Sequence, residues 1–139
     1  KLKTMKIFKN ILAVIAGIIG GSIVNMGILE LGPQIIPNPV GFDNTDMEAL
    51  AATSHLLQPI NYLIVFLAHG LGTLAGAFIA AKIAVTKQKV FALALGGWFL
   101  IGGITAIFMI PSPTWYIIVD LAGAYFPMAW IGWKLAGSK

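Results

Sequence analysis

The chain contains no cysteine and no arginine, and only 10% of its 139 residues are charged. Without cysteine, disulfides, thiolate catalysis and cysteine-ligated zinc or iron–sulfur sites are excluded. A soluble domain of this length needs far more charge to cover its surface, whereas 58% of these residues are hydrophobic. The composition therefore predicts that a lipid bilayer surrounds most of the chain.

Several motifs are also missing. The sequence has no glycine-rich phosphate loop, no HExxH pair, no paired histidines suited to haem and no Ser/His/Asp spacing typical of hydrolases. We therefore predict no catalytic residue, no metal site and no cofactor. The basic residues are lysines beside apolar runs, which indicates contact with anionic lipid headgroups and argues against nucleic-acid binding.

The lysines that are present are distributed unevenly. They precede the first apolar run (Lys1, Lys3, Lys6, Lys9), separate the second from the third (Lys82, Lys87, Lys89) and follow the fourth (Lys134, Lys139). The carboxylates lie toward the other ends of the runs (Glu30, Asp43, Asp46, Glu48, Asp120). Because lysines beside spans stay cytoplasmic, this partition predicts a multi-pass protein of the bacterial inner membrane with both termini cytoplasmic.

The apolar runs predict an all-α fold, a bundle of four transmembrane helices in a single domain over residues 1–139. The expected spans cover about residues 7–31, 60–81, 90–110 and 115–135, each long enough to cross roughly 30 Å of hydrocarbon. Tyr62, Trp115 and Tyr116 are expected in an outer aromatic belt, and Trp130 and Trp133 in an inner one. Residues 1–4 and 137–139 are assigned no function, since a typical bacterial start begins at Met5.

The outer connection, residues 32–59, is too long to be structureless in so small a protein. Thr45 and Glu48 have the capping-box spacing, which predicts a short amphipathic helix over about residues 46–57. Two interpretations remain open: this helix rests at the level of the headgroups, or it covers a cavity that faces outward.

Small residues recur at one-turn spacing in the first two spans. Gly17 and Gly21 share one face, and Gly72 and Gly76 share another. Such rows let helix backbones approach closely. They predict either tight packing within the bundle or a homodimer through these faces.

Polar side chains within the spans form a predicted layer in the outer half. Counting about 1.5 Å per residue places Asn25, Thr105 and Asp120 roughly 7–9 Å to the outer side of the middle, with His69 nearer the middle. Because polar groups that face lipid are costly, these four side chains should turn inward and meet. They are our candidate ligand-binding residues. Pro127 should also kink the fourth span, while Tyr125 is expected in the core.

Asp120 and His69 lead to the most specific hypothesis about function. A His–Asp pair at this depth can relay protons, bind a cation or orient the amine of a ligand. The plainer interpretation is a hydrogen bond that fixes the register between helices. Three functions therefore follow: binding or transport of a small ligand or ion, a non-catalytic accessory or assembly role, and a membrane enzyme that uses the pair for proton transfer.

The segment LGPQIIPNPVGFDNTDMEALAA, followed by FLAHGLGTLAGAFIAAKIA, resembles a set of small bacterial four-span proteins of unassigned function. The chain is also similar to DoxX-like membrane proteins in size and hairpin plan. Neither resemblance implies a role for any residue. Small multidrug transporters of similar length carry a glutamate in the middle of the first span, where this chain has glycine and isoleucine and places Glu30 only at the end.

Overall fold

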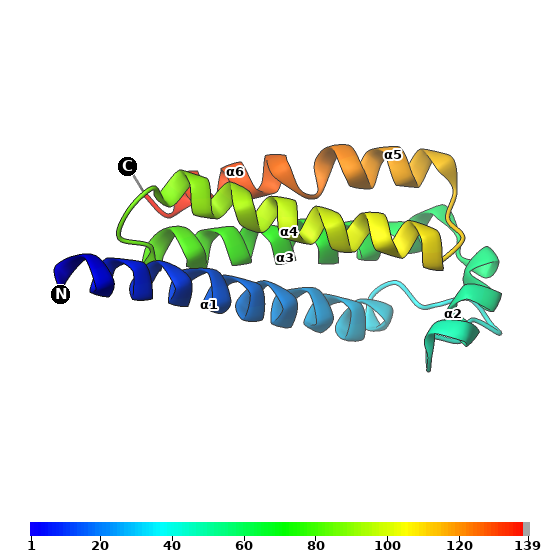
Figure 1. Cartoon of the computed structure of the whole chain (residues 1–139). Coiled ribbons are helices and arrows are strands. Elements are labelled where there is room, and N and C mark those ends of the chain that lie inside the picture. Colours follow the sequence, from blue (N-terminus) through cyan, green and yellow to red (C-terminus); the bar gives the residue numbers. More distant parts are fainter. Residues whose placement is uncertain (138–139) are drawn as a thin grey trace.

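The computed structural model describes residues 1–137, and every regular element in that range is a helix. In chain order these are α1 (Leu2–Leu31), η1 (Gly32–Gln34), α2 (Met47–Thr53), η2 (Ser54–Leu56), α3 (Pro59–Ile83), α4 (Gln88–Met109), α5 (Thr114–Gly123) and α6 (Phe126–Leu135). The long helices lie side by side, and α2 lies across one end of the bundle (Figure 1).

Three helices are long and apolar enough to cross a membrane. They extend over Leu2–Gln34, Pro59–Ile83 and Gln88–Met109. These correspond to the first three predicted spans, although α1 begins at Leu2 rather than near residue 7. No glycine or proline interrupts residues 2–6, so the helix continues through them.

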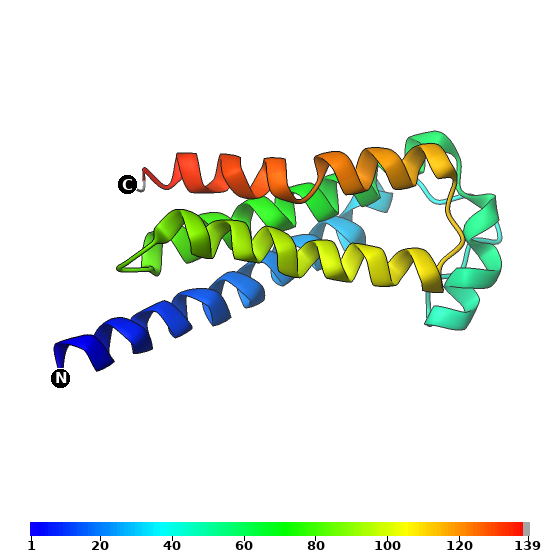
Figure 2. The ribbon, with the colours of Figure 1, turned by 45° about the horizontal axis from the view of Figure 1, so that its top comes forward.

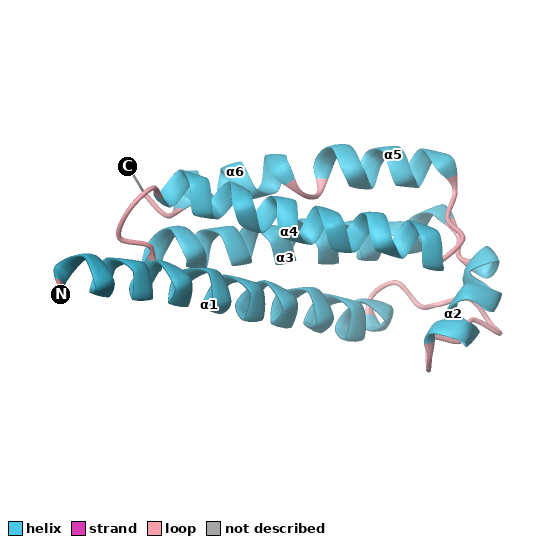
Figure 3. Ribbon diagram, viewed as in Figure 1, coloured by secondary structure: helices cyan, strands magenta, loops and turns pink. Residues whose placement is uncertain are grey.

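The fourth predicted span, residues 115–135, is not a single helix. The structure divides this region into α5 and α6, each of 10 residues, with a break at Ala124 and Tyr125 (Figure 3). Pro127 lacks the N–H that would bond to the carbonyl of residue 123, and a proline disfavours helical geometry in the residue before it. The expected kink is therefore a complete interruption.

The contact between α1 and α3 depends on glycine. A Cβ on Gly17 would lie 2.7 Å from the Gly76 carbonyl oxygen, and one on Gly21 would lie 2.6 Å from that of Gly72. The close approach expected of these rows is confirmed, but it joins two helices of the same chain. All four glycines are buried there, so the faces that we considered for a homodimer are occupied in this structure.

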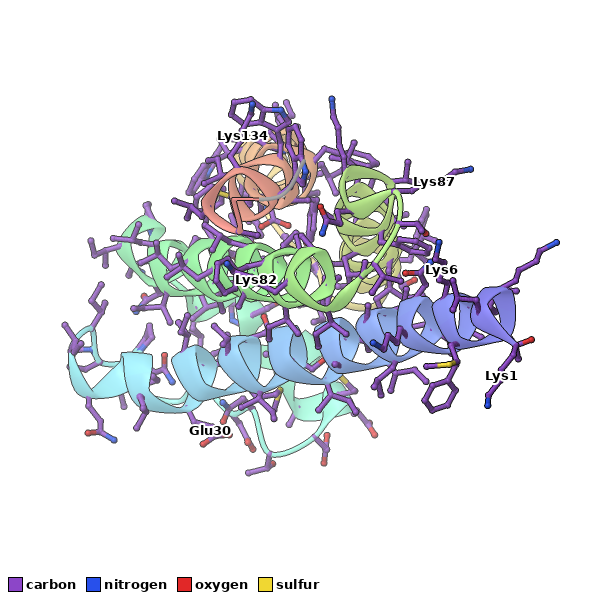
Figure 4. The ribbon with its side chains drawn as sticks, turned by 90° about the vertical axis from the view of Figure 1, so that its left-hand side faces the viewer. Lys1, Lys6, Glu30, Lys82, Lys87 and Lys134 are labelled. Carbon is purple, nitrogen blue, oxygen red and sulfur yellow. The ribbon has the colours of Figure 1, made fainter. Side chains whose placement is uncertain are left out.

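The charged ends of the helices separate as the sequence predicts. Figure 4 views the bundle from the end where α1 begins and α6 ends, and it shows labelled lysines of α1, α3, α6 and the α3–α4 loop there. Glu30 lies at the far end of α1. Lys139, which we expected on the lysine side, falls outside the described residues.

Near the lysine end the interior is built of small apolar side chains. One cluster of buried residues joins α3, α4 and the C-terminal end of α6, and all but one of its members are alanine: Ala77, Ala80, Ala81, Ala92, Leu95, Ala129 and Ala136. Small side chains let the backbones approach closely, so this cluster is tightly packed.

The outer connection folds into a cap of its own. The N-terminus of α2 is capped by Asp46, whose carboxylate accepts from the Ala49 N–H at 2.8 Å. The predicted cap at Thr45 is therefore wrong by one residue, because Thr45 instead donates its N–H and hydroxyl to Asp43. Farther on, the Asn61 side chain donates to the Pro37 carbonyl at 3.0 Å, which ties the connection to α3.

Candidate functional site

His69 and Asp120 lie together, as the polar layer predicted. Their side chains come from α3 and α5, and His69 Nδ1 is 2.9 Å from Asp120 Oδ1. The Asp120 side chain is 5% exposed and that of His69 is 22% exposed. In the arrangement in which the carboxylate is ionised it can only accept, so Nδ1 then carries the hydrogen of this bond and Nε2 is the second ring nitrogen.

Tyr125 is a second hydrogen-bond partner of the Asp120 carboxylate. Its hydroxyl donates to Asp120 Oδ2 at 2.9 Å and lies 3.2 Å from His69 Nδ1. Gly103 of α4 makes room for this hydroxyl, since a Cβ there would overlap it. The break between α5 and α6 thus places Tyr125 against a carboxylate only five residues earlier in the chain.

Tyr116 lies beside His69, Asp120 and Tyr125. Its hydroxyl lies 3.5 Å from His69 Nδ1, a distance at the limit of hydrogen bonding. We assigned Tyr116 and Tyr62 to an outer aromatic belt, but both are buried, with ring centroids 4.5 Å apart. The spacing to Asp120 could have revealed Tyr116, since residues four apart share a helix face. We call His69, Tyr116, Asp120 and Tyr125 the His–Asp cluster.

The other two candidates do not join the cluster. Thr105 is exposed and donates its hydroxyl to the Ile101 carbonyl of its own helix at 2.8 Å, so its predicted place in the layer is wrong. Asn25 is half-buried and makes no direct hydrogen bond to the cluster, although it lines a cavity that also touches His69.

An outer cavity of about 220 Å³ ends at the cluster. Its walls are mostly apolar side chains of α3, α4 and α5, such as Val65, Ile107 and Ile117, and Asp120, His69 and Tyr116 also line it. The connection between α1 and α3 forms the remaining wall through Pro33, Ile36, Asn38, Phe42, Asn44, Leu50, Ser54 and Leu57. The interpretation of this connection as the cover of a cavity is therefore the one that the structure favours.

The outer cavity is lined by one acidic side chain and one histidine, Asp120 and His69. Among residues 1–137, Asp120 is the one carboxylate that lines it, and no lysine does. Within residues 1–137, no three His, Asp or Glu side chains are grouped as metal ligands would be. The arrangement can hold a proton between His69 and Asp120, or it can receive a hydrogen-bond donor or a cation from the cavity.

No protein-family model, curated protein or solved structure matches this chain.

Proposed function

We propose that this chain is a four-span protein of the bacterial inner membrane that binds a small, mostly apolar amine in its outer cavity. Both termini would be cytoplasmic, with α5 and α6 together forming the fourth span. In support, these two helices run end to end beside α4 over residues 114–135, and α6 ends at the same end of the bundle at which α1 begins (Figure 1). The break is acceptable inside a membrane because Ala124 and Tyr125 are buried in protein.

The observation that carries the proposal is a buried carboxylate at the end of an apolar cavity. Asp120 faces this space, no lysine of the described residues lines it, and His69 is the basic side chain in contact with the carboxylate. A primary ammonium group has three donors, which suit carboxylate and tyrosine oxygens. The apolar walls would receive the hydrocarbon part of the ligand.

The size of the outer cavity limits the ligand. A dry apolar cavity of ~150 Å³ accepts benzene, and this one is about 220 Å³. A ligand somewhat larger than benzene fits, such as an arylalkylamine. The exposed carboxylates Asp43, Asp46 and Glu48 lie in the covering connection, and their charge would attract cations to this end of the bundle.

An accessory role is the competing function, and one observation favours it. His69, Asp120 and Tyr125 satisfy one another with hydrogen bonds, as a cluster that only fixes helix register would. A membrane enzyme that uses the His–Asp pair is a third function, which would require conversion of a lipid-soluble substrate that disappears in His69→Ala.

Thermal unfolding of the purified protein in lipid nanodiscs, with and without 2-phenylethylamine, tests the binding proposal. A ligand at a hundred times its dissociation constant stabilises the folded state by about 2.7 kcal/mol. We expect such stabilisation for the natural chain and none for Asp120→Asn. Propylbenzene, which has the same shape without the ammonium group, should stabilise far less.

Thr105→Val is the matched control, because Thr105 is polar but lies outside the outer cavity. It should retain the full response to the amine. If a series of arylalkylamines and alkylamines leaves the natural chain unaffected, the binding proposal is wrong and the accessory role is preferred. An equal response in Asp120→Asn would place the amine elsewhere.

A further inference from the structure

A second cavity, of about 420 Å³, lies between α1, α3 and α4. We call it the lateral cavity. It is lined by Ser22, Asn25, His69, Gly72, Thr73, Trp98, Phe99, Ile101, Gly102, Gly103 and Tyr125, and no residue of the outer connection contributes. Only His69 and Gly103 line both cavities, so these two residues form the partition between them.

The mouth of the lateral cavity faces the hydrocarbon of the proposed membrane. Trp98 is 56% exposed and Ile101 is 64% exposed, and both belong to the spanning helix α4. A Cβ added to Gly102 would have no atom within 4 Å. Figure 2 shows α1 crossing the bundle at an angle instead of running parallel to α4. The opening is therefore sideways, between α1 and α4.

The inner wall carries polar groups that lack partners. The side chains of Ser22 and Asn25 make no hydrogen bond to any residue in the described part of the chain, 1–137. Asn25 is held against α3, since a Cβ on Gly72 would lie 3.0 Å from the Asn25 Cβ. An amide without a partner at membrane depth is costly. An occupant of the lateral cavity that offers a hydrogen bond to Asn25 is therefore favoured over one that does not.

His69 limits which hydrogen-bonding groups an occupant of the lateral cavity should carry. When Asp120 is ionised, Nδ1 of a neutral ring donates to it, which leaves Nε2 as an acceptor. The Asn25 amide nitrogen is a donor. A hydroxyl group is the smallest group that donates to one and accepts from the other. An ether only accepts, and an alkane does neither.

We propose that the lateral cavity binds a lipid-soluble alcohol or phenol that enters from the bilayer and places its hydroxyl between Asn25 and His69. Its hydrocarbon part lies along Trp98, Phe99 and Ile101 and extends through the mouth into the lipid. This site is separate from the outer cavity, and its occupancy does not require that an amine binds there.

Photolabelling in phosphatidylcholine vesicles tests this site. The probe is hexadecanol with a diazirine close to its hydroxyl, and the labelled residues are mapped by mass spectrometry. We expect adducts within residues 22–25 and 98–102. Unlabelled 1-hexadecanol should compete for them, whereas hexadecyl methyl ether, which cannot donate, should need at least about fivefold more, the effect of one hydrogen bond.

Two variants should weaken the labelling about fivefold or more. Asn25→Leu removes the amide at nearly constant volume, and Gly102→Leu extends a side chain across the open mouth. Gly27→Leu is the matched control, because a Cβ there also meets nothing within 4 Å but Gly27 does not line the lateral cavity. It should label like the natural chain.

Labelling that is spread over the lipid-facing surface and unchanged in both variants would overturn the proposal, as would equal competition by the alcohol and the ether. Should Asn25→Leu fail to fold, Gly102→Leu decides alone. Ile107→Trp, which fills the outer cavity, separates the two sites. It should abolish the response to the amine and leave labelling by the alcohol intact.

Discussion

The two ends of this bundle are built on opposite principles. Toward the lysine end, α3, α4 and α6 meet through alanines such as Ala80, Ala92 and Ala129, each fully buried. Toward the other end, the helices enclose a cavity that reaches a buried carboxylate, Asp120. Close packing of small side chains therefore stabilises the bundle around the alanine cluster. The other end is less closely packed, and its outer cavity has room for a ligand.

The largest effect is expected where packing is closest. In Gly76→Val, the new Cβ would lie 2.7 Å from the Gly17 carbonyl oxygen, and backbone cannot yield as a flexible side chain does. Overpacking of this kind destabilises by about 3 kcal/mol. Unfolding in mixed micelles with increasing dodecyl sulfate, followed by circular dichroism, measures the loss.

Gly27→Val is the control for this substitution, because a Cβ on Gly27 meets nothing within 4 Å. It should change the free energy of unfolding by no more than about 0.5 kcal/mol. If both variants behave alike, α1 and α3 do not touch through glycine, and the close-packed part of the comparison fails.

A smaller effect is expected at the partition between the cavities. Gly103→Ala would push the Tyr125 hydroxyl away from Asp120 and leave the buried carboxylate with one donor fewer, at about 2 kcal/mol. Gly102→Ala meets open space and should stabilise α4 slightly, by up to about 1 kcal/mol. The same micelle assay measures the change in the free energy of unfolding for both variants. Changes of opposite sign would confirm that the His–Asp cluster packs against Gly103, whereas changes of the same sign would contradict this position.

Tyr125→Phe isolates the hydroxyl itself. The ring stays, Asp120 Oδ2 loses its donor, and the bond between Oδ1 and His69 remains. We expect a loss of about 1 kcal/mol, less than in Gly103→Ala because nothing is displaced. Differential scanning calorimetry in nanodiscs measures it. An increase in stability would mean that the hydroxyl is not bonded to Asp120.

The smallest effect concerns the outer connection. Hydrogen bonds from the Thr45 N–H and hydroxyl lower the pKa of Asp43 from its ordinary value. The stabilisation is therefore complete above the unfolded pKa of about 3.9 and is lost as the pH falls through the lower folded value. The Thr45 amide resonance should shift only below about pH 4, and Asp43→Asn should remove this titration. A midpoint above the ordinary value would contradict the bond.

Much of the fold could be predicted because single residues determine it. Gly17 and Gly76 indicated a close helix contact, and the lysines indicated which helix ends lie together. The interruption at Tyr125 could not be predicted in full, because Pro127 is compatible with either a kink or a break and the packing around Tyr125 decides between them.

The candidate site was predicted only in part. Depth along the helices correctly paired His69 with Asp120 but included Thr105, whose side chain bonds to its own helix. Counting residues gives depth, whereas the rotation of a helix about its axis depends on its neighbours. For the same reason Tyr116 was taken as a surface residue, although it faces inward.

Cysteine accessibility tests whether the outer end holds an accessible cavity while the alanine cluster is closely packed. The chain has no cysteine, so Ile107→Cys in the outer cavity and Ala92→Cys in the alanine cluster can be compared on the same helix. Aminoethyl methanethiosulfonate would be added to vesicles from the side opposite the termini. We predict rapid modification at position 107, slowed by 2-phenylethylamine, and none at position 92. Equal modification at both positions, or none at 107, would contradict the account.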